Sequence, residues 1–299
     1  MTAASRAGFW LRWMPAVFVL IWSTGFVVAR FGMPNSPPMT FLSFRYALSL
    51  ACLLPWIVLS RAPWPRTGLQ TLHLMVTGAL IQGVYLGGVW SAVRLGMGAG
   101  LSALIVGLQP VLTALWLSHS GDRVTWRQWG GLAMGLMGLF LVVSSKLAVA
   151  SEVNAHTVGF CLCALAGITI GTLYQKRFVH TCDVRTAMTV QVAAALVMTL
   201  PLALLETEPV HWNSEMAGAL AWSVCVLTLG GSSLLYLLIQ RGAATQVTSL
   251  MYLVPPATAL LAWLLFGEPI TVLTVLGTGL TAWGVSWVVR QPSAQPKTE

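Results

Sequence analysis

The sequence has very little charge for its length. Only 8% of its 299 residues are Asp, Glu, Lys or Arg, whereas a soluble domain carries about 25%. A chain with so few charges cannot cover its surface with polar groups in water, so a soluble globular fold is excluded. Hydrophobic residues make up 57% of the chain and gather in runs long enough for a helix to cross a bilayer. The sequence therefore predicts an integral membrane protein whose surroundings are the lipid bilayer.

Clusters of reactive residues are also lacking. The five cysteines are scattered, without the spacing of a disulfide framework or a metal site. The motifs HExxH and GxSxG do not occur, so we expect no enzymatic activity, no metal and no cofactor. The net charge of +8 comes from dispersed basic residues and not from a dense basic arm, so nucleic acid is not an expected partner.

Ten apolar spans are separated by charges, prolines and polar turns, and we expect each span to be a transmembrane helix. Their approximate limits are 13–31, 39–59, 70–92, 98–118, 127–145, 157–175, 185–205, 216–239, 245–266 and 271–289. The first span lacks a small-residue cleavage site, so we expect it to be retained and not removed as a signal peptide. The prediction is a multi-pass, all-α fold without a separate soluble domain.

The basic residues predict the orientation of these spans, because cytoplasmic loops are rich in Lys and Arg. With the N-terminus in the cytoplasm, twelve basic residues fall inside and three outside. The twelve are Arg6, Arg12, Arg61, Arg66, Arg123, Arg127, Lys176, Arg177, Arg185, Arg241, Arg290 and Lys297. The three are Arg30, Arg94 and Lys146. This bias predicts that both termini are cytoplasmic, and it supports the number of spans.

The sequence repeats itself weakly at a spacing of 146 residues. The matches are Pro55 with Pro201, Gly96 with Gly242, Pro110 with Pro256, Asp122 with Glu268, and Thr125 with Thr271. Each half holds five spans, an odd number, so the second half starts from the opposite side of the membrane, as in many secondary transporters. We predict two inverted five-helix repeats, over residues 1–147 and 153–290.

Three stretches resemble a known family. They are Ile21-Trp-Ser-Thr-Gly-Phe-Val-Val-Ala-Arg-Phe-Gly32, the segment from Gly107-Leu-Gln-Pro110 to Gly138, and its echo from Leu253-Val-Pro-Pro256 through Phe266-Gly-Glu268 to Gly284. They resemble the two EamA-type repeats of the drug/metabolite transporter superfamily, and among its members the YddG-like exporters of amino acids. The resemblance covers nearly the whole chain and implies a location in a bacterial inner membrane. Its motifs are specific for the superfamily and say little about the substrate.

Two sets of helix-distorting or small residues recur in both halves. Pro110 in the fourth span matches Pro255 and Pro256 in the ninth, near the middle of each span. Proline frees backbone carbonyls and bends a helix, so we predict paired kinks that line the pathway and flex; simple packing kinks are the alternative. Glycines recur at helical spacing in the fifth and tenth spans, which predicts close helix packing between the halves. We expect a monomer or a homodimer.

Arg45 is the single charged residue that we place inside a span and away from its ends. It lies about seven residues into the second span, roughly 10 Å from the outer end at about 1.5 Å per residue, so its side chain can extend toward the outer surface. Two roles are open. Arg45 could bind the carboxylate of an amino acid substrate, or it could anchor the second helix to carbonyl groups or to an outer acid such as Glu268.

Polar and aromatic side chains at mid-span depth are the candidate substrate-binding residues. Besides Arg45 they are Trp22, Ser23, Thr24, Gln82, Tyr85, Trp90, Gln109, Thr172, Tyr174, Ser232, Tyr236 and Tyr252. Tyrosine and tryptophan combine a large apolar surface with one hydrogen-bonding tip, which suits a partly apolar solute. Trp90 has an alternative role in the belt of aromatic residues at the membrane interface.

No Asp or Glu lies in the middle of a span. Proton-coupled antiporters generally need a titratable group at depth, so we expect facilitative transport of a neutral or zwitterionic small molecule by alternating access between the two halves. The leading hypothesis is export of amino acids, aromatic or other neutral ones, and related metabolites. The alternative is a proton-coupled exporter of drugs or hydrophobic cations, which would ask for an acid in the pathway.

Overall fold

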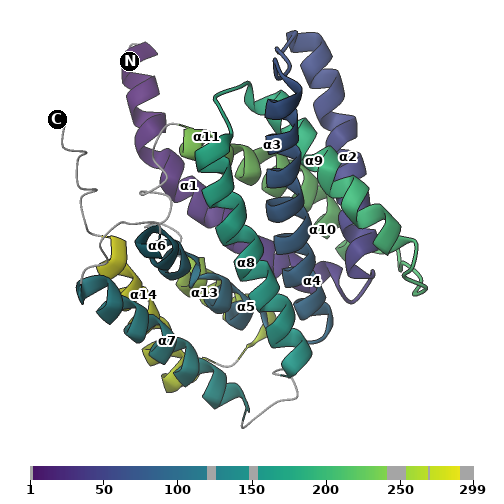
Figure 1. The fold of residues 1–299 in the computed structure, drawn as a ribbon. Coiled ribbons are helices and arrows are strands. Elements are labelled where there is room, and N and C mark those ends of the chain that lie inside the picture. The colour runs from purple at the N-terminus through teal and green to yellow at the C-terminus, as the bar shows by residue number, and fades with distance from the viewer. Residues whose placement is uncertain (1–2, 120–125, 148–153, 241–253, 269, 290–299) are drawn as a thin grey trace, which may run out of the picture.

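The computed structural model of the chain describes residues 3–119, 126–147, 154–240, 254–268 and 270–289. These residues form helices and connecting segments, with no β-strand among them (Figure 1). Five of the helical runs are long and apolar enough to cross a membrane, and shorter apolar helices accompany them. The predicted all-α membrane fold is confirmed.

The helices follow the predicted spans closely. In the first half they are α1 (Ala3–Gly32), α2 (Pro38–Ser60), the continuous run of α3 (Gly68–Gly78), η1 (Ala79–Tyr85) and α4 (Leu86–Arg94), then α5 (Ala99–Val106), α6 (Gln109–His119) and α7 (Trp126–Leu147). In the second half they are α8 (Ala155–Phe178), α9 (Val184–Ala203), the continuous run of α10 (Ser214–Trp222), η2 (Ser223–Ser232) and α11 (Ser233–Gln240), then α13 (Val254–Phe266) and α14 (Val272–Val289). The segments η1 and η2 are π-helical.

Short polar side chains mark the starts of several helices. Thr67, Asn154, Asp183 and Asn213 each accept a hydrogen bond from a backbone N–H in the first turn of α3, α8, α9 and α10, respectively. The first N–H groups of a helix have no intrahelical partner, and Ser, Thr, Asn and Asp are the residues best suited to cap them. These caps determine where each connecting segment ends and the following helix begins.

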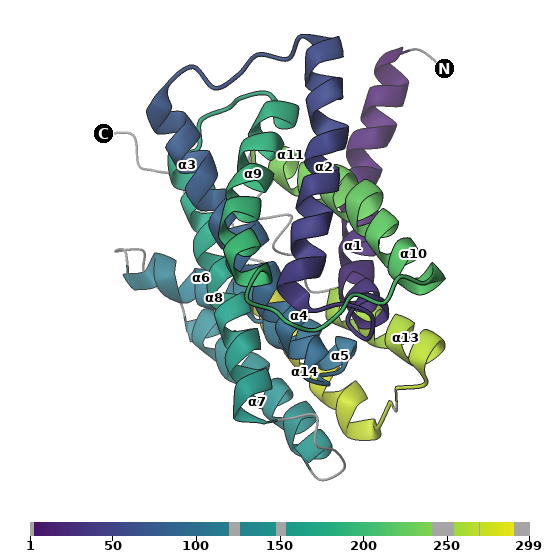
Figure 2. The same ribbon diagram turned by 90° about the vertical axis from the view of Figure 1, so that its right-hand side faces the viewer.

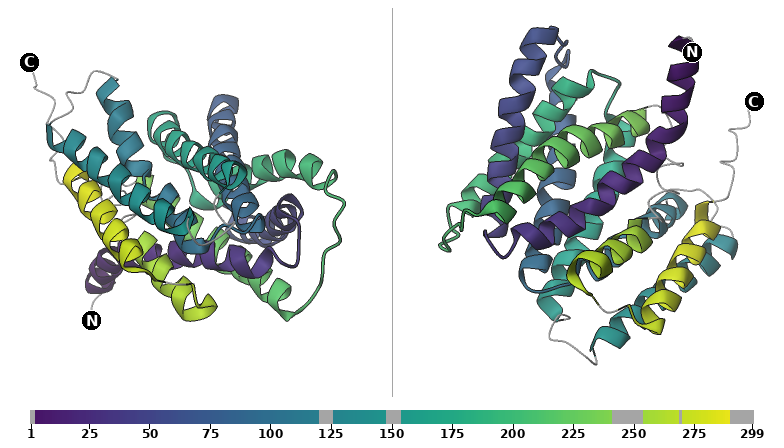
Figure 3. Two further views of the ribbon diagram at one scale, coloured as in Figure 1. Left: turned by 90° about the horizontal axis from the view of Figure 1, so that it is seen from below. Right: turned by 180° about the vertical axis from the view of Figure 1, so that it is seen from behind.

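Helices at equivalent positions of the two halves pack against one another. The contacts join α7 to α14, α2 to α9 and α5 to α13, and these pairs lie side by side in the ribbon views (Figures 2 and 3). The run containing η1 contacts α8, just as the run containing η2 contacts α1. Two five-helix halves related by an approximate two-fold axis produce this exchange of neighbours.

The fourth predicted span is interrupted. α5 ends at Val106 and α6 begins at Gln109, so Pro110 lies in the first turn of α6. Proline is tolerated there because the first N–H groups of a helix need no intrahelical acceptor. The structure therefore places Pro110 at a helix start and not in the middle of a continuous helix. Pro255 and Pro256 lie in α13, and the part of the predicted ninth span before Val254 lies outside the described residues. A Cβ atom on Gly107, at the interruption, would lie 2.7 Å from Pro255 Cγ, so the two matching regions touch.

Close backbone contact between α7 and α14 depends on glycine. A Cβ atom on Gly277 would lie 2.6 Å from the carbonyl oxygen of Gly138 and 2.5 Å from Val142 Cγ2. A Cβ atom on Gly284 would lie 2.6 Å from the carbonyl oxygen of Gly131. Small residues let helices approach in a bilayer, where van der Waals packing drives their association.

Substitution of Gly277 by alanine should therefore destabilise the protein by about 1–3 kcal/mol, the usual cost of overpacking a tight contact. Gly279 is the matched control, because it lies on the same helix and a Cβ atom there meets nothing within 4 Å. Thermal unfolding in detergent, followed by size-exclusion chromatography, should show a lower midpoint for Gly277→Ala alone. Equal midpoints for the two variants would contradict this packing.

Candidate functional site

A cavity lies between α1, α2, the run of η1 and α4, and η2, with about 420 Å³ of empty space when the open solvent at its mouth is included. The residues that line it are Trp22, Gly25, Phe26, Arg45, Ile81, Gln82, Tyr85, Leu86, Val89, Trp90, Leu227 and Ser232. Most are apolar or aromatic and a few are polar, which is the usual composition of a small-molecule site. The cavity brings together six of the predicted substrate-binding residues, namely Trp22, Arg45, Gln82, Tyr85, Trp90 and Ser232.

Aromatic rings form one wall of the cavity. The rings of Trp22 and Tyr85 are parallel, with an interplanar angle of 1° and centroids 6.1 Å apart. Trp90 stacks on Phe41 with centroids 4.4 Å apart, and it is only 1% exposed. Trp90 thus lies inside the protein, and its alternative place in an interfacial belt is wrong.

Arg45 is buried beside the cavity and does not extend to the outer surface as its position in the span suggested. It is 2% exposed, and its Nε donates a hydrogen bond of 2.9 Å to Thr228 Oγ1 in η2. Its Nη1 is buried without a partner among the described residues. The acid considered as its anchor, Glu268, instead accepts a hydrogen bond of 2.8 Å from Arg30. Arg45 lies inside the bundle because α2 packs against both α9 and η2.

Gln82 is the second buried polar group of the cavity. Its Nε2 donates a hydrogen bond of 3.0 Å to Ser232 Oγ, and its Oε1 is buried without a partner among the described residues. The backbone carbonyl of Gln82 accepts a hydrogen bond from the hydroxyl of Tyr46. Buried polar groups are nearly always paired, and Arg45 Nη1 and Gln82 Oε1 are the two groups of the cavity lining that lack a partner among the described residues.

The sequence profile of the EamA-like transporter family matches residues 10–144 and again residues 157–290. The chain belongs to this family. The prediction that it is a transporter and not an enzyme is confirmed by this membership.

Relatives of this EamA-like transporter match along nearly their whole lengths. An "Uncharacterized transporter" of Archaeoglobus fulgidus is 24% identical, over 90% of this chain and 94% of its own. A "Probable amino-acid metabolite efflux pump" of Escherichia coli K12 is 23% identical, over 89% and 90% of the two chains. The "Uncharacterized inner membrane transporter YedA" of the same organism is 24% identical, over 90% and 88%. A crystal structure that is 17% identical superposes with a TM-score of 0.67, over 92% and 96% of the two chains, and it supports the fold.

The two π-helical segments of this EamA-like transporter occupy matching places. At the repeat spacing of 146 residues, residues 79–85 of η1 correspond to residues 225–231 inside η2. π-helical turns are rare and are frequent at functional sites. In lipid, irregular backbone is tolerated where it is buried in protein or lines a cavity. Both segments contribute to the cavity wall, η1 through Gln82 and Tyr85 and η2 through Leu227 and Ser232.

The other predicted site residues that the structure describes do not line this cavity. Four of them are Ser23 and Thr24 in α1, Gln109 at the start of α6, and Thr172 in α8. Ser23 and Thr24 donate to carbonyl groups of their own helix. Gln109 Nε2 donates a hydrogen bond of 3.1 Å to Thr172 Oγ1, which joins the start of α6 to α8.

The remaining predicted residues lie near the end of the bundle that is predicted to be cytoplasmic. The hydroxyl of Tyr174 lies 2.7 Å from His73 Nδ1, and that of Tyr236 lies 2.9 Å from Cys182 Sγ. Tyr252 lies outside the described residues.

Sequence reasoning missed Thr228, which holds Arg45. A signal for it was present, because Thr228 is the counterpart of Gln82 at the repeat spacing of 146 residues. The apolar lining residues, such as Gly25 and Leu227, carry no signal of their own, because any apolar residue in a span faces either lipid or protein.

The end of the bundle that is predicted to be outside joins the two halves by charged contacts. Glu268 of the second half accepts hydrogen bonds from Arg30 Nη1 at 2.8 Å and from the backbone N–H of Ala99 at 3.1 Å. Arg94 of the first half forms an ion pair with Glu208 of the second. These contacts join the two halves at this end.

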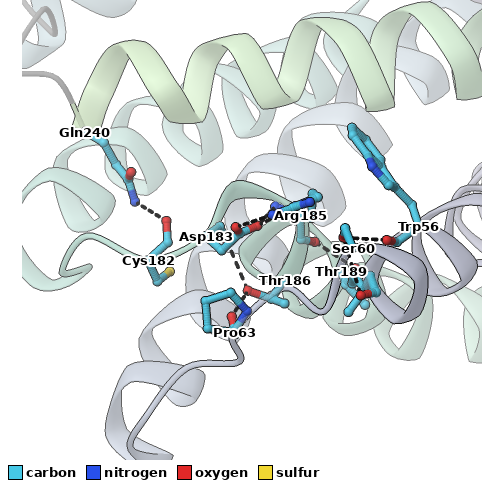
Figure 4. Close-up of polar contacts among 10 residues, drawn as sticks. Trp56, Ser60, Pro63, Cys182, Asp183, Arg185, Thr186, Thr189 and Gln240 are labelled. Carbon is cyan, nitrogen blue, oxygen red and sulfur yellow. Dashed lines mark hydrogen bonds and ion pairs between the residues drawn. The ribbon is translucent and has the colours of Figure 1, made fainter.

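The opposite end is organised around the start of α9 (Figure 4). Arg185 donates to both carboxylate oxygens of Asp183, at 2.9 and 2.7 Å, and this bonding lowers the pKa of the Asp183 carboxyl below its ordinary value. Thr186 Oγ1 donates a hydrogen bond of 2.9 Å to the carbonyl of Pro63, and Gln240 donates one to the carbonyl of Cys182. The link through Thr186 crosses between the halves here, as does the contact of Tyr174 with His73.

Glu206 should contribute more to stability than its neighbour Glu208. Its carboxylate accepts hydrogen bonds from the backbone N–H groups of Met39 and Thr40, at 3.0 and 2.8 Å, and from the Thr40 hydroxyl. Glu206→Ala leaves these N–H groups at the start of α2 unpaired, which should cost about 1–2 kcal/mol, as for the loss of a helix cap.

Glu208→Ala is the control for this substitution, because it removes only a contact whose carboxylate side chain is 60% exposed, and pairs of this kind contribute about 0–1 kcal/mol. Thermal unfolding in detergent should therefore show the larger loss for Glu206→Ala. A larger loss for Glu208→Ala would contradict the role of Glu206 as a cap.

Proposed function

We propose that this EamA-like transporter exports neutral or zwitterionic amino acids, aromatic ones among them, and related metabolites across a bacterial inner membrane. The observation that carries the proposal is a partly apolar, aromatic-walled cavity with one buried guanidinium group whose Nη1 has no partner among the described residues. The name of the relative from Escherichia coli K12, "Probable amino-acid metabolite efflux pump", points to the same class of substrate.

Arg45 would bind the substrate carboxylate. Its Nε is already occupied by Thr228, which leaves Nη1 for a charge-assisted hydrogen bond. Trp22, Tyr85 and Val89 line the same cavity and offer apolar and aromatic surface to the side chain of the substrate. A multiply charged anion does not fit this site, because Arg45 is the only cationic residue among the residues that line it.

Transport would proceed by alternating access between the two inverted halves. The contacts of Arg30 with Glu268 and of Arg94 with Glu208 would have to break when the outer end opens. The interrupted fourth helix, whose Gly107 touches Pro255 of the opposite half, offers a place for the halves to bend against each other. Hinges of this kind absorb the change in a few residues at element ends.

Coupling to protons through a carboxylate in the cavity is not expected. None of the residues that line the cavity is Asp or Glu, and an exporter of hydrophobic cations would need such a group to balance the charge of its substrate. A buried arginine in the same cavity repels a cation. The proposal is therefore facilitative export, and the cation exporter is the outcome that the experiment must exclude.

Counterflow of radiolabelled phenylalanine, leucine and alanine in proteoliposomes tests the proposal. At least one of them should exchange with and without a pH gradient. Arg45→Gln should lower the exchange rate about 10- to 100-fold, the equivalent of one hydrogen bond to a charged group. Arg61→Gln is the control, because Arg61 lies at an exposed position just after the same helix.

Three results would count against the proposal. A lack of exchange for every amino acid tested would contradict the substrate assignment. Exchange that strictly requires the pH gradient would contradict the facilitative mechanism. Unchanged exchange by a monodisperse Arg45→Gln variant would show that Arg45 only anchors α2.

A further inference from the structure

Two hydroxyl groups of η2, those of Thr228 and Ser232, donate to backbone carbonyls of their own helix. Thr228 Oγ1 donates its proton to the carbonyl of Ser223 at 3.0 Å, and Ser232 Oγ donates its proton to the carbonyl of Leu227 at 3.3 Å. Each acceptor lies five residues earlier, the spacing that a π-helical turn brings together. A hydroxyl carries a single proton, so both oxygens can act toward other groups only as acceptors.

These two acceptors determine how Arg45 and Gln82 are oriented. Thr228 Oγ1 accepts from Arg45 Nε at 2.9 Å, and Ser232 Oγ accepts from Gln82 Nε2 at 3.0 Å. The two ends of a glutamine amide are otherwise hard to distinguish and are assigned from the hydrogen-bond network. In this network the Ser232 hydroxyl donates to the carbonyl of Leu227 and accepts from the amide nitrogen of Gln82, which leaves Gln82 Oε1 without a partner among the described residues.

The cavity lining therefore has one unpaired hydrogen-bond donor and one unpaired acceptor. Arg45 Nη1, a charged donor, and Gln82 Oε1, a neutral acceptor, are both buried without a partner among the described residues. Leaving such groups unpaired is costly, and in native structures they are usually satisfied by an ordered water or a ligand. The complement of this pair is a molecule that carries an anionic acceptor and a separate N–H donor.

We propose that Thr228 and Ser232 are positioning residues that make the cavity selective for zwitterions. Arg45 binds the carboxylate, and Gln82 Oε1 accepts a hydrogen bond from the ammonium group of the same substrate. This assignment rests on the proposed function, which places a small zwitterion in the cavity. It adds that Gln82 binds the ammonium group and that Thr228 and Ser232 orient the binding groups. A carboxylic acid without the amine would leave Gln82 Oε1 unpaired, and an amine without the carboxylate would leave Arg45 Nη1 unpaired.

The test compares the binding of phenylalanine, 3-phenylpropanoate and phenethylamine to the full-length protein in detergent, by calorimetry. The wild-type protein should bind phenylalanine at least about 10-fold more tightly than either analogue, the effect of one unmet buried hydrogen bond. Ser232→Ala should reduce the preference over 3-phenylpropanoate, because the Gln82 amide is then free to turn. Thr228→Val should reduce the preference over phenethylamine, because Arg45 loses its anchor.

Conservative variants separate positioning from folding. Ser232→Thr and Thr228→Ser keep the hydroxyl and should keep the wild-type preferences, while Ser233→Ala, at the adjacent position in α11 and outside the cavity, should change nothing. Thermal unfolding of each variant shows whether it is folded.

Two results would overturn the inference alone. They are equal wild-type affinity for phenylalanine and 3-phenylpropanoate, and an unchanged preference in a folded Ser232→Ala variant. Failure of the wild-type protein to bind phenylalanine, leucine or alanine would instead overturn the proposed function, and the inference with it.

Discussion

The absence of water inside a bilayer is the constraint on which the rest of this structure depends, because each polar group within the membrane must find a partner in the protein. Arg45 is the extreme case, since it is charged and 2% exposed. The hydroxyl of Thr228 accepts from it, and that hydroxyl in turn donates to the carbonyl of Ser223. The π-helical segment η2 provides these groups from the half of the protein opposite to Arg45. Burial of one cation thus joins the two halves at the cavity.

The remaining contacts between the halves are of two kinds. α7 and α14 meet through Gly138 and Gly277, without room for a Cβ atom, and form a tightly packed pair. The contacts at the two ends are polar: Arg30 with Glu268 at one and Thr186 with the carbonyl of Pro63 at the other. Close apolar packing is hard to rearrange, whereas a few polar contacts can break and form again. In the proposed mechanism, the ends of the bundle would move while the α7–α14 pair stays packed.

Much of this architecture could be predicted from the sequence, because the bilayer imposes strong regularities on length and charge. The predicted span 185–205 corresponds to α9 (Val184–Ala203), and the family profile matches both halves. The site was predicted less completely, because hydropathy shows which residues lie in a span and not which side of the helix faces a neighbour. Trp90, Gln82 and Arg45 were predicted as candidates and line the cavity, whereas Thr228 was not predicted, and the sequence left open whether Arg45 lies inward or toward the outer surface. The π-helical segments have no sequence signature beyond their matching positions.

The central claim is that the cavity beside Arg45, and not another space in the bundle, holds the substrate. Gly25→Cys and Gly100→Cys test it as a matched pair. Gly25 lines this cavity and Gly100 lines a second one beside Glu268, and a Cβ atom at either position makes only ordinary contacts, the nearest at 3.7 and 3.6 Å. Maleimide labelling of each cysteine, measured by mass spectrometry of the labelled peptide, should slow at Gly25→Cys when an exported amino acid is added and stay unchanged at Gly100→Cys. Protection at Gly100→Cys alone would contradict the account.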